Sequence, residues 1–233
     1  MAGERATHLG SPGGSASLKA QRIREQRQAR QASRSGLGRI AAALFEPETD
    51  KRLRQEERRW TAGAGGEQSL ASYLARHCPD IPMLHDRRAA GTRGNIDHIA
   101  VAPSGIYVID CKRYKGKIEV TQPLFGKPKL KINGREQTKL VEGLDQQVQR
   151  VRATIADSTP EIPIRGCLCF VAPGGFLADS GLPLLRTLKL NGYPLYYPRR
   201  LAKHLNERGT LTPEHCLTLQ GELAERLPAA PAG

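Results

Sequence analysis

Residues 95–118 read NIDHIAVAPSGIYVIDCKRYKGKI, and this stretch decides the fold. It contains two runs, 96–102 and 106–111, that are rich in β-branched and aromatic residues. Ala-Pro-Ser-Gly, a typical turn sequence, joins them. The stretch therefore predicts a β-hairpin whose two strands lie side by side in an antiparallel sheet.

The register of this hairpin follows from counting. If residues 103 and 104 form the tip, the numbers of facing partners sum to 207, and Asp97 lies opposite Asp110. Alternate residues of a strand share a face, so Lys112 projects beside these two carboxylates. The next pairs toward the turn are apolar, which indicates a partly buried cluster of like charges. A longer turn would remove this opposition.

A third carboxylate lies upstream. Residues 67–77, EQSLASYLARH, carry apolar side chains at helical spacing, and Glu67 lies one turn before Leu70 on the same face. Carboxylates gathered in one place suit a hard dication such as Mg²⁺ or Mn²⁺, and Lys112 would position an attacking water or offset developing phosphorane charge. The predicted metal ligands are Glu67, Asp97 and Asp110.

Further elements follow from their apolar patterns. Apolar residues recur at intervals of three and four from Leu140 to Ile155, which predicts an amphipathic helix with Gln147 at the margin of its apolar face. The nearly continuous apolar run 165–172 predicts a central strand covered on both faces. A short strand in YPLYYP, 193–198, and a closing helix over 198–209 follow.

The ends of the chain differ in composition from the centre. Residues 1–40 contain eight basic and two acidic residues and few large apolar side chains, which is typical of a solvated tail or of a nucleic-acid-binding arm. The predicted divisions are a flexible basic extension over 1–47, a lead-in helix over 48–62 that the glycines end, an α/β core over 63–176, a C-terminal strand and helix addition packed on the core over 177–224, and a flexible tail over 225–233.

The overall charge indicates a polyanionic partner. Lys and Arg number 36 against 23 Asp and Glu, for a formal net charge of +13, and nucleic acid is the polyanion that we expect. No apolar stretch approaches the roughly 18 residues of a spanning helix, and the first residues lack the apolar core of a signal peptide. We therefore expect a soluble cytoplasmic protein with no membrane partner.

The five cysteines include no Cys-x-x-Cys pair, so we expect free thiols rather than disulfides or a zinc knuckle. Cys167 and Cys169 lie in a predicted strand and should be buried and inert. His98 follows Asp97 and points to the opposite sheet face, which predicts a packing or hydrogen-bonding role rather than metal ligation.

A basic segment follows the predicted site. The runs 117–121 and 129–132 predict a pair of short strands that form a flap rather than core, and their lysines suit either a phosphate backbone or a solvated edge. The chain has no P-loop, so a motor would be a partner helicase or ATPase; a homodimer is also compatible. The predicted nucleic-acid-binding residues are Arg113, Lys115, Lys117, Lys127, Lys129 and Lys131.

Three motifs together resemble the nuclease-related domain family, NERD, of the PD-(D/E)XK superfamily. These are GAGGEQSL at 63–70, the block 95–118 and QQV at 146–148, and the resemblance covers about 63–172. It implies an α/β fold with a restriction-endonuclease-like α-β-β-β-α-β core, in which helices flank a central mixed sheet. The family's catalytic residues carry over onto Glu67, Asp97, Asp110, Lys112 and Gln147, with Gln146 as an adjacent rival for the last.

The leading hypothesis is a metal-dependent nuclease, an endonuclease or nickase that uses Mg²⁺ or Mn²⁺ and acts on DNA rather than RNA. The alternative is a nucleic-acid-binding module that keeps the nuclease fold without useful turnover. A protein-interaction scaffold is a third possibility, and strong DNA binding would exclude it.

Overall fold

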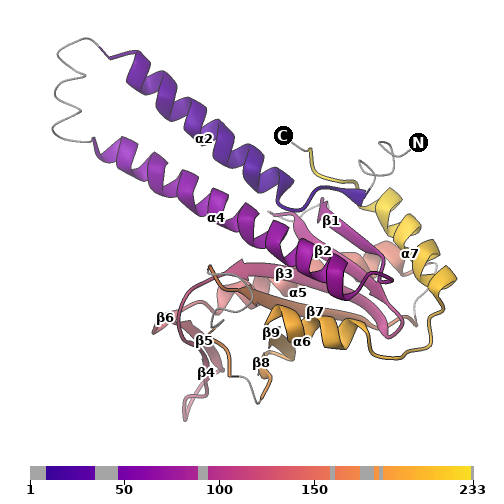
Figure 1. Ribbon diagram of the computed structural model, residues 1–233. Helices are drawn as coiled ribbons and strands as arrows, with labels where there is room; N and C mark the ends of the chain where they lie inside the picture. The colour runs from indigo at the N-terminus through magenta and orange to yellow at the C-terminus, as the bar shows by residue number, and fades with distance from the viewer. Residues whose placement is uncertain are drawn as a thin grey trace.

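A six-stranded sheet forms the centre of the computed structural model, which describes residues 9–34, 47–88, 94–157, 161–173, 181–183 and 186–231 (Figure 1). The strand order is β1-β2-β3-β7-β9-β8, and a smaller sheet has the order β4-β5-β6. Because β3, β7 and β9 run parallel while their other neighbours are antiparallel, the large sheet is mixed. The strands are β1 Met83–Arg87, β2 Ile96–Ala102, β3 Gly105–Arg113, β4 Ile118–Thr121, β5 Lys129–Ile132, β6 Arg135–Glu136, β7 Ile164–Val171, β8 Leu188–Leu190 and β9 Tyr193–Tyr196.

Helices cover both faces of the large sheet: α4 and α6 pack on one face, and α5 and α7 on the other. The chain order α4-β1-β2-β3-α5-β7 confirms the predicted α-β-β-β-α-β core, with the small sheet inserted between β3 and α5. Within the described ranges, none of the helices has the length and apolarity needed to cross a membrane. The helices are α2 Gly14–Ala32, α4 Glu48–His77, α5 Lys139–Ile155, α6 Pro198–Leu205 and α7 Pro213–Arg226.

Strand β7 occupies the middle of the sheet, between β3 and β9. Its Cys167 and Cys169 face α4 and α6, whereas Leu168 and Phe170 face α5 and α7. This arrangement explains the continuous apolar run, because a strand covered on both faces needs apolar residues at every position. Both cysteines are buried and free, as predicted.

The β2–β3 hairpin has the predicted register: Ile99 pairs with Val108, and Ala102 pairs with Gly105. Gly105 has φ +131°, and an added Cβ would lie 2.3 Å from the carbonyl oxygen of Pro163, so the turn requires glycine there. On the face opposite Asp97, His98 is fully buried and its Nδ1 lies 2.8 Å from Nδ1 of His85. The predicted packing role of His98 is therefore confirmed.

The lead-in helix predicted over 48–62 does not end at the glycines, because α4 is one helix from Glu48 to His77. At Gly66 an added Cβ would lie 3.0 Å from Cβ of Arg113, so this glycine lets the helix approach β3 closely. On another side of α4, a Cβ added to Gly13 would lie 2.8 Å from Cα of Ala64, so Gly13 lets the start of α2 approach α4 closely. Packing on both sides therefore overrides the low helix propensity of glycine.

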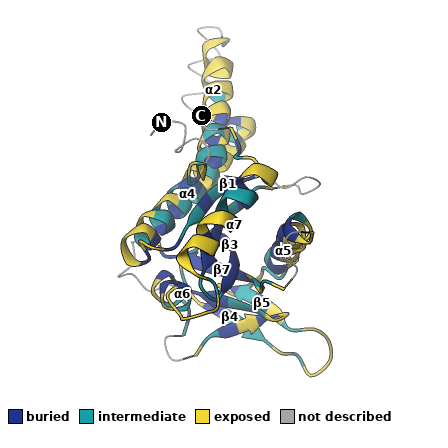
Figure 2. Ribbon diagram, turned by 90° about the vertical axis from the view of Figure 1, so that its right-hand side faces the viewer, coloured by how far each residue is buried: buried dark blue, intermediate teal, exposed yellow. Residues whose placement is uncertain are grey.

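The prediction of a flexible extension over 1–47 is wrong for residues 9–34, whereas 1–8 and 35–46 lie outside the described residues. Figures 1 and 2 show that α2 runs antiparallel along α4, and that both extend beyond the sheet as an arm. Small side chains and Ile23 are buried between the helices. Three ion pairs also join the α2 and α4 sides of the arm: Arg24–Glu57 at 2.7 Å, Arg27–Glu57 at 3.1 Å and Arg34–Asp50 at 2.8 Å. A count of apolar residues could not reveal these ion pairs.

The flexible tail predicted over 225–233 is also wrong as far as residue 231. The backbone N–H of Ala230 donates to the carbonyl of Asp86 at 2.8 Å, and Ala230 is buried. The buried Arg87 guanidinium donates to the carbonyls of Ala224 and Leu227, both at 2.6 Å, and so satisfies the end of α7. These contacts come from β1 and α7, two elements that the sequence patterns did not predict.

The small sheet is not merely a flap. Ile118, Leu130 and Ile132 are buried in the same core as α5 and α7, so the base of the β4–β5 hairpin is part of the core. Only the far end of that hairpin leaves the body of the protein (Figure 2).

Candidate functional site

One cavity brings the predicted site residues together. It has a volume of about 490 Å³ and lies where α4, α5 and the start of α2 meet β2 and β3. The residues that line it include all five predicted catalytic residues: Glu67, Asp97, Asp110, Lys112 and Gln147.

Strand β3 contributes the core of the cluster. Nζ of Lys112 lies 2.5 Å from Oδ1 of Asp110, and Asp110 is only 6% exposed. The β2–β3 pairing ends at His98 and Ile109, one residue before the two aspartates. There the Asp97 carboxylate accepts a hydrogen bond of 2.7 Å from the backbone N–H of Cys111, which holds it beside β3.

The carboxylates raise one another's pKa. Burial, with the nearby Asp86 and Asp110 charges, raises the pKa of Glu67 to about 7, although Lys112 acts in the opposite direction. Burial and then the Asp110 charge raise the pKa of Asp97 well above its ordinary value. Burial alone would lower the pKa of the Lys112 ammonium, but Asp110 and Asp97 outweigh burial and raise it. One ammonium thus balances only part of the negative charge.

The donor set fits a hard divalent cation, because carboxylate oxygens are the ligands that Mg²⁺ and Mn²⁺ prefer. Gln147 adds a buried Oε1 that has no hydrogen-bond partner in the described part of the chain, while its Nε2 donates to the carbonyl of Asn95 at 3.2 Å. Gln146 also lines the cavity but is exposed, so Gln147 is the anchored glutamine.

In this structure the Lys112 ammonium contacts the carboxylate of Asp110. Within the described ranges, no three His, Cys, Asp or Glu side chains are already spaced as a metal site. Two groups of the cluster already have partners: Lys112 is paired with Asp110, and the backbone N–H of Gly13 donates to the Glu67 carboxylate. Metal binding at Asp110 would therefore compete with Lys112.

The sequence analysis did not predict that residues of α2 line one side of the cavity. Asp86, which is 2% exposed with φ +48°, accepts from the N–H of Ser15 at 2.6 Å, from Oγ of Ser15 at 2.8 Å and from Nδ2 of Asn95 at 2.7 Å. Lys19 also lines the cavity, with Nζ 4.0 Å from the ring centroid of Trp60. Gly-Gly-Ser at 13–15 is typical of a helix start, but nothing in the sequence links it to Asp86.

The predicted nucleic-acid-binding residues lie outside the cavity. Arg113 donates to the carbonyls of Ala62 and Pro173, which fixes it against α4. Lys117 pairs with Glu119, and Lys129 pairs with Glu136. The other three residues, Lys115, Lys127 and Lys131, lie on the segment that contains the β4–β5 hairpin. The basic residues at the cavity itself are Lys19, Lys112 and Lys139.

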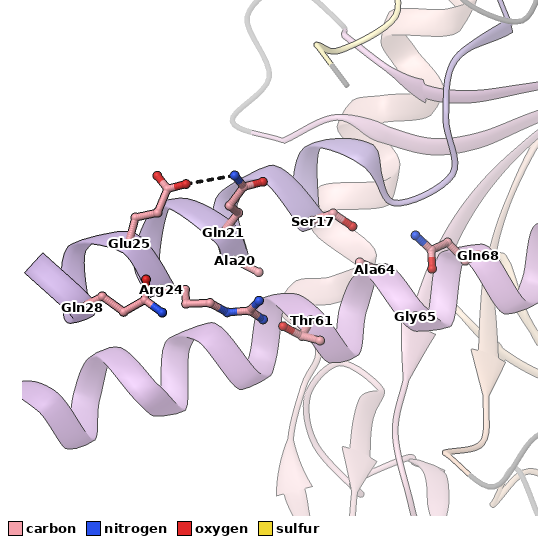
Figure 3. A pocket seen from close by; sticks show the side chains of 10 residues that line it. All are labelled: Ser17, Ala20, Gln21, Arg24, Glu25, Gln28, Thr61, Ala64, Gly65 and Gln68. Carbon is pink, nitrogen blue, oxygen red and sulfur yellow. Dashed lines mark hydrogen bonds between the residues drawn. The ribbon is translucent and has the colours of Figure 1, made fainter. Parts of the chain in front are cut away.

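A second cavity, of about 570 Å³, lies in the groove between α2 and α4 (Figure 3). Its one acidic residue, Glu25, accepts a hydrogen bond of 2.9 Å from Nε2 of Gln21, and its other lining residues are small, polar or basic. This groove offers no carboxylate cluster, so the candidate metal site is confined to the first cavity.

Residues 62–171 match the family model described as "Nuclease-related domain". No curated protein and no solved structure gives a match. The matched range contains all five predicted catalytic residues, whereas α2 and the first part of α4 lie before it.

Proposed function

Residues 62–171 belong to the nuclease-related domain family, and we propose that they form a divalent-metal-dependent nuclease that hydrolyses phosphodiester bonds of DNA. One observation carries the proposal: three carboxylates from three elements and one ammonium line a single cavity. Their mutual repulsion in a partly buried place is unfavourable without a cation, and such unsatisfied charge is typical of functional sites.

Each side chain has a role. The oxygens of Glu67, Asp97 and Asp110 would hold Mg²⁺ or Mn²⁺. Such an ion, when bound, polarises a phosphodiester and lowers the pKa of an attacking water. Lys112 remains charged and offsets negative charge on the phosphate or orients the water. The amide of Gln147, held through Asn95, presents its oxygen as an acceptor.

The substrate class follows from charge. The chain carries a net +13, and Lys19 and Lys139 flank the carboxylates at the cavity, so a polyanion is drawn to an otherwise acidic centre. DNA is the proposed polyanion, and the test below supplies it as supercoiled plasmid.

The deciding experiment measures nicking of supercoiled plasmid by the full chain with Mg²⁺, Mn²⁺ or EDTA. We expect Asp110→Asn and Lys112→Ala to lower the nicking rate by about 100-fold or more, because each removes a group from the reacting centre. Asp80→Asn is the matched control, since Asp80 is exposed in the turn after α4. Equal nicking by all four proteins would place the activity elsewhere or in a contaminant.

Metal binding is tested separately by titration calorimetry with Mn²⁺ in the absence of DNA. The wild type and Asp80→Asn should bind alike, whereas Asp97→Asn should bind about tenfold more weakly or worse, since a ligand is lost. Unchanged binding in Asp97→Asn would contradict the assigned ligands.

One observation favours the second candidate, a nucleic-acid-binding module without turnover: the Asp110–Lys112 pair is closed at 2.5 Å. This candidate requires DNA binding that weakens steeply with salt, persists in Asp110→Asn and leads to no cleavage with any metal. The homodimer and the helicase or ATPase partner stay predictions.

A further inference from the structure

The tip of the β4–β5 hairpin exposes two consecutive large apolar side chains. Leu124 is 97% exposed and Phe125 is 93% exposed. Figure 2 shows the joining loop reaching away from the body of the protein. Single exposed apolar residues are common, but an adjacent pair at the apex of a projection indicates a surface that meets a partner.

The projection has a fixed base and a shaped tip. Ile118, Leu130 and Ile132 bury the base in the core, and Gln137 N–H donates to the carbonyl of Leu130 at 2.8 Å. Toward the tip, Nε2 of Gln122 donates to the carbonyl of Gly126 at 3.4 Å. Prolines 123 and 128 further restrict the loop. The two apolar side chains therefore lie at the end of an ordered projection, residues 115–136, which we call the stalk.

The stalk is basic. Residues 115–136 contain six basic and two acidic residues, a net charge of +4, and the basic residues occur on both sides of the apolar tip. A partner must therefore offer an apolar site for Leu124 and Phe125 and negative charge for the basic residues on both sides of them. A nucleic acid offers both, since its backbone is anionic and its stacked bases are apolar.

The hairpin also connects the two halves of the catalytic cavity. β4 follows β3, which carries Asp110 and Lys112, and β6 leads into α5, which carries Lys139 and Gln147. Figures 1 and 2 show the α2–α4 arm extending toward the top of the molecule and the hairpin lying at its lower end. A polynucleotide held at the cavity would thus have the hairpin on one side and the arm on the other.

From these observations we infer that Leu124 and Phe125 form a wedge that inserts between the bases of a bound nucleic acid while the lysines of the stalk hold its backbone. The inference rests on the proposed function for its substrate class. It adds that the protein unstacks a base step beside the phosphodiester that it binds, as apolar wedges do in minor-groove and architectural proteins.

The test uses the full chain with a DNA duplex that contains 2-aminopurine, in EDTA so that no cleavage is needed. Binding of the wild type should raise 2-aminopurine fluorescence severalfold through unstacking. The double variant Leu124→Ala/Phe125→Ala should lose this rise and bind about tenfold more weakly by fluorescence anisotropy. Leu217→Ala is the matched control, because Leu217 is 60% exposed on α7, away from the hairpin.

The outcomes separate the wedge from the nuclease. A fluorescence rise that persists undiminished in the double variant overturns the wedge, as does wild-type binding with no rise. Unstacking without nicking by any protein keeps the wedge and removes the nuclease. Because both variants alter exposed residues, equal melting temperatures are expected and exclude misfolding as the cause.

A lipid surface is the competing occupant. Co-sedimentation with phosphatidylserine vesicles tests it, since an apolar tip flanked by basic residues also suits an anionic interface. Vesicle binding that depends on Phe125, together with unchanged 2-aminopurine fluorescence, would contradict the wedge. Absence of vesicle binding supports it.

Discussion

Glu57 and Glu67 lie on the same helix and on opposite sides of its glycines, yet their carboxylates meet opposite environments. Hydrogen bonds from Arg24 and Arg27 lower the pKa of Glu57. Burial and neighbouring carboxylates raise the pKa of Glu67 to about 7. The first charge is satisfied by the fold and fastens the arm, whereas the second lies among other carboxylates whose charge Lys112 only partly offsets. Unsatisfied charge, rather than acidity as such, distinguishes the site.

The largest difference should appear in catalysis. Glu67→Gln should lower Mg²⁺-dependent plasmid nicking by about 100-fold or more, because an amide of the same shape is a poorer ligand for a dication. Glu57→Gln should leave the rate within about twofold, since Glu57 pairs with Arg24 and Arg27 of the arm and does not line the cavity. Comparable losses in both variants would show that Glu67 acts through the arm rather than at the metal.

The pH dependence should also differ in sign. The folded protein keeps a proton on Glu67 between its ordinary pKa of 4.5 and about 7, so stability falls as the pH rises through this window. The loss reaches up to about 3 kcal/mol at 1.36 kcal/mol per pKa unit. The lowered pKa of Glu57 instead gives stability that is lost in acid, below its ordinary pKa.

Urea unfolding across this window checks the sign. Glu67→Gln should flatten the decline in stability, and nicking should increase as Glu67 ionises around pH 7. Mg²⁺ should stabilise the protein more at pH 8 than at pH 5, because it binds the ionised form. A stability that rises between pH 4.5 and 7 and is unaltered in Glu67→Gln would contradict the assigned repulsion.

The attachment of α2 gives a smaller effect. Asp86→Ala removes the acceptor for Ser15 and Asn95 and should cost about 2 kcal/mol of stability, since three hydrogen bonds to a buried charge are lost. Ser15→Ala removes one of these bonds and should cost about 1 kcal/mol. Chemical denaturation measures both, and equal effects would mean that the backbone N–H of Ser15 is unimportant.

The smallest expected effect concerns the glycines between the two glutamates. Gly63→Ala meets no atom within 4 Å and should stabilise α4 by about 1 kcal/mol through helix propensity. Gly66→Ala places Cβ 3.0 Å from Cβ of Arg113 and should destabilise the protein by about 1 kcal/mol or more. Equal stabilisation by both would show that α4 does not need its close approach to β3.

The sequence predicted those parts of the fold that follow from local patterns. Alternation and a turn sequence gave the register of β2 and β3, and with it the meeting of Asp97, Asp110 and Lys112. The 3.6-residue period predicted α5, and a continuous apolar run predicted β7. These features need only contacts between neighbouring elements.

What could not be predicted depends on contacts between distant segments. α2 has little apolar surface, and its order comes from Glu57 and Asp50 on another helix. The glycines of α4 looked like a helix end because Arg113, which Gly65 and Gly66 approach, lies far away in sequence. Asp86 joins the site through Ser15, 71 residues away, and no local signal reports such a bond.

Asp86 has a consequence for the order in which the molecule can be assembled. Its carboxylate holds Ser15 near one end of the chain, and its carbonyl accepts from Ala230 near the other. During synthesis, α2 can pair with α4 as soon as α4 follows, but the hydrogen bonds that fix Ser15 form only after β1 has emerged. The backbone bond between Asp86 and Ala230 forms only when residue 230 leaves the ribosome. The acidic residues of the candidate site are therefore synthesised before the hydrogen bonds around Asp86, which complete the α2 side of the cavity, can all form.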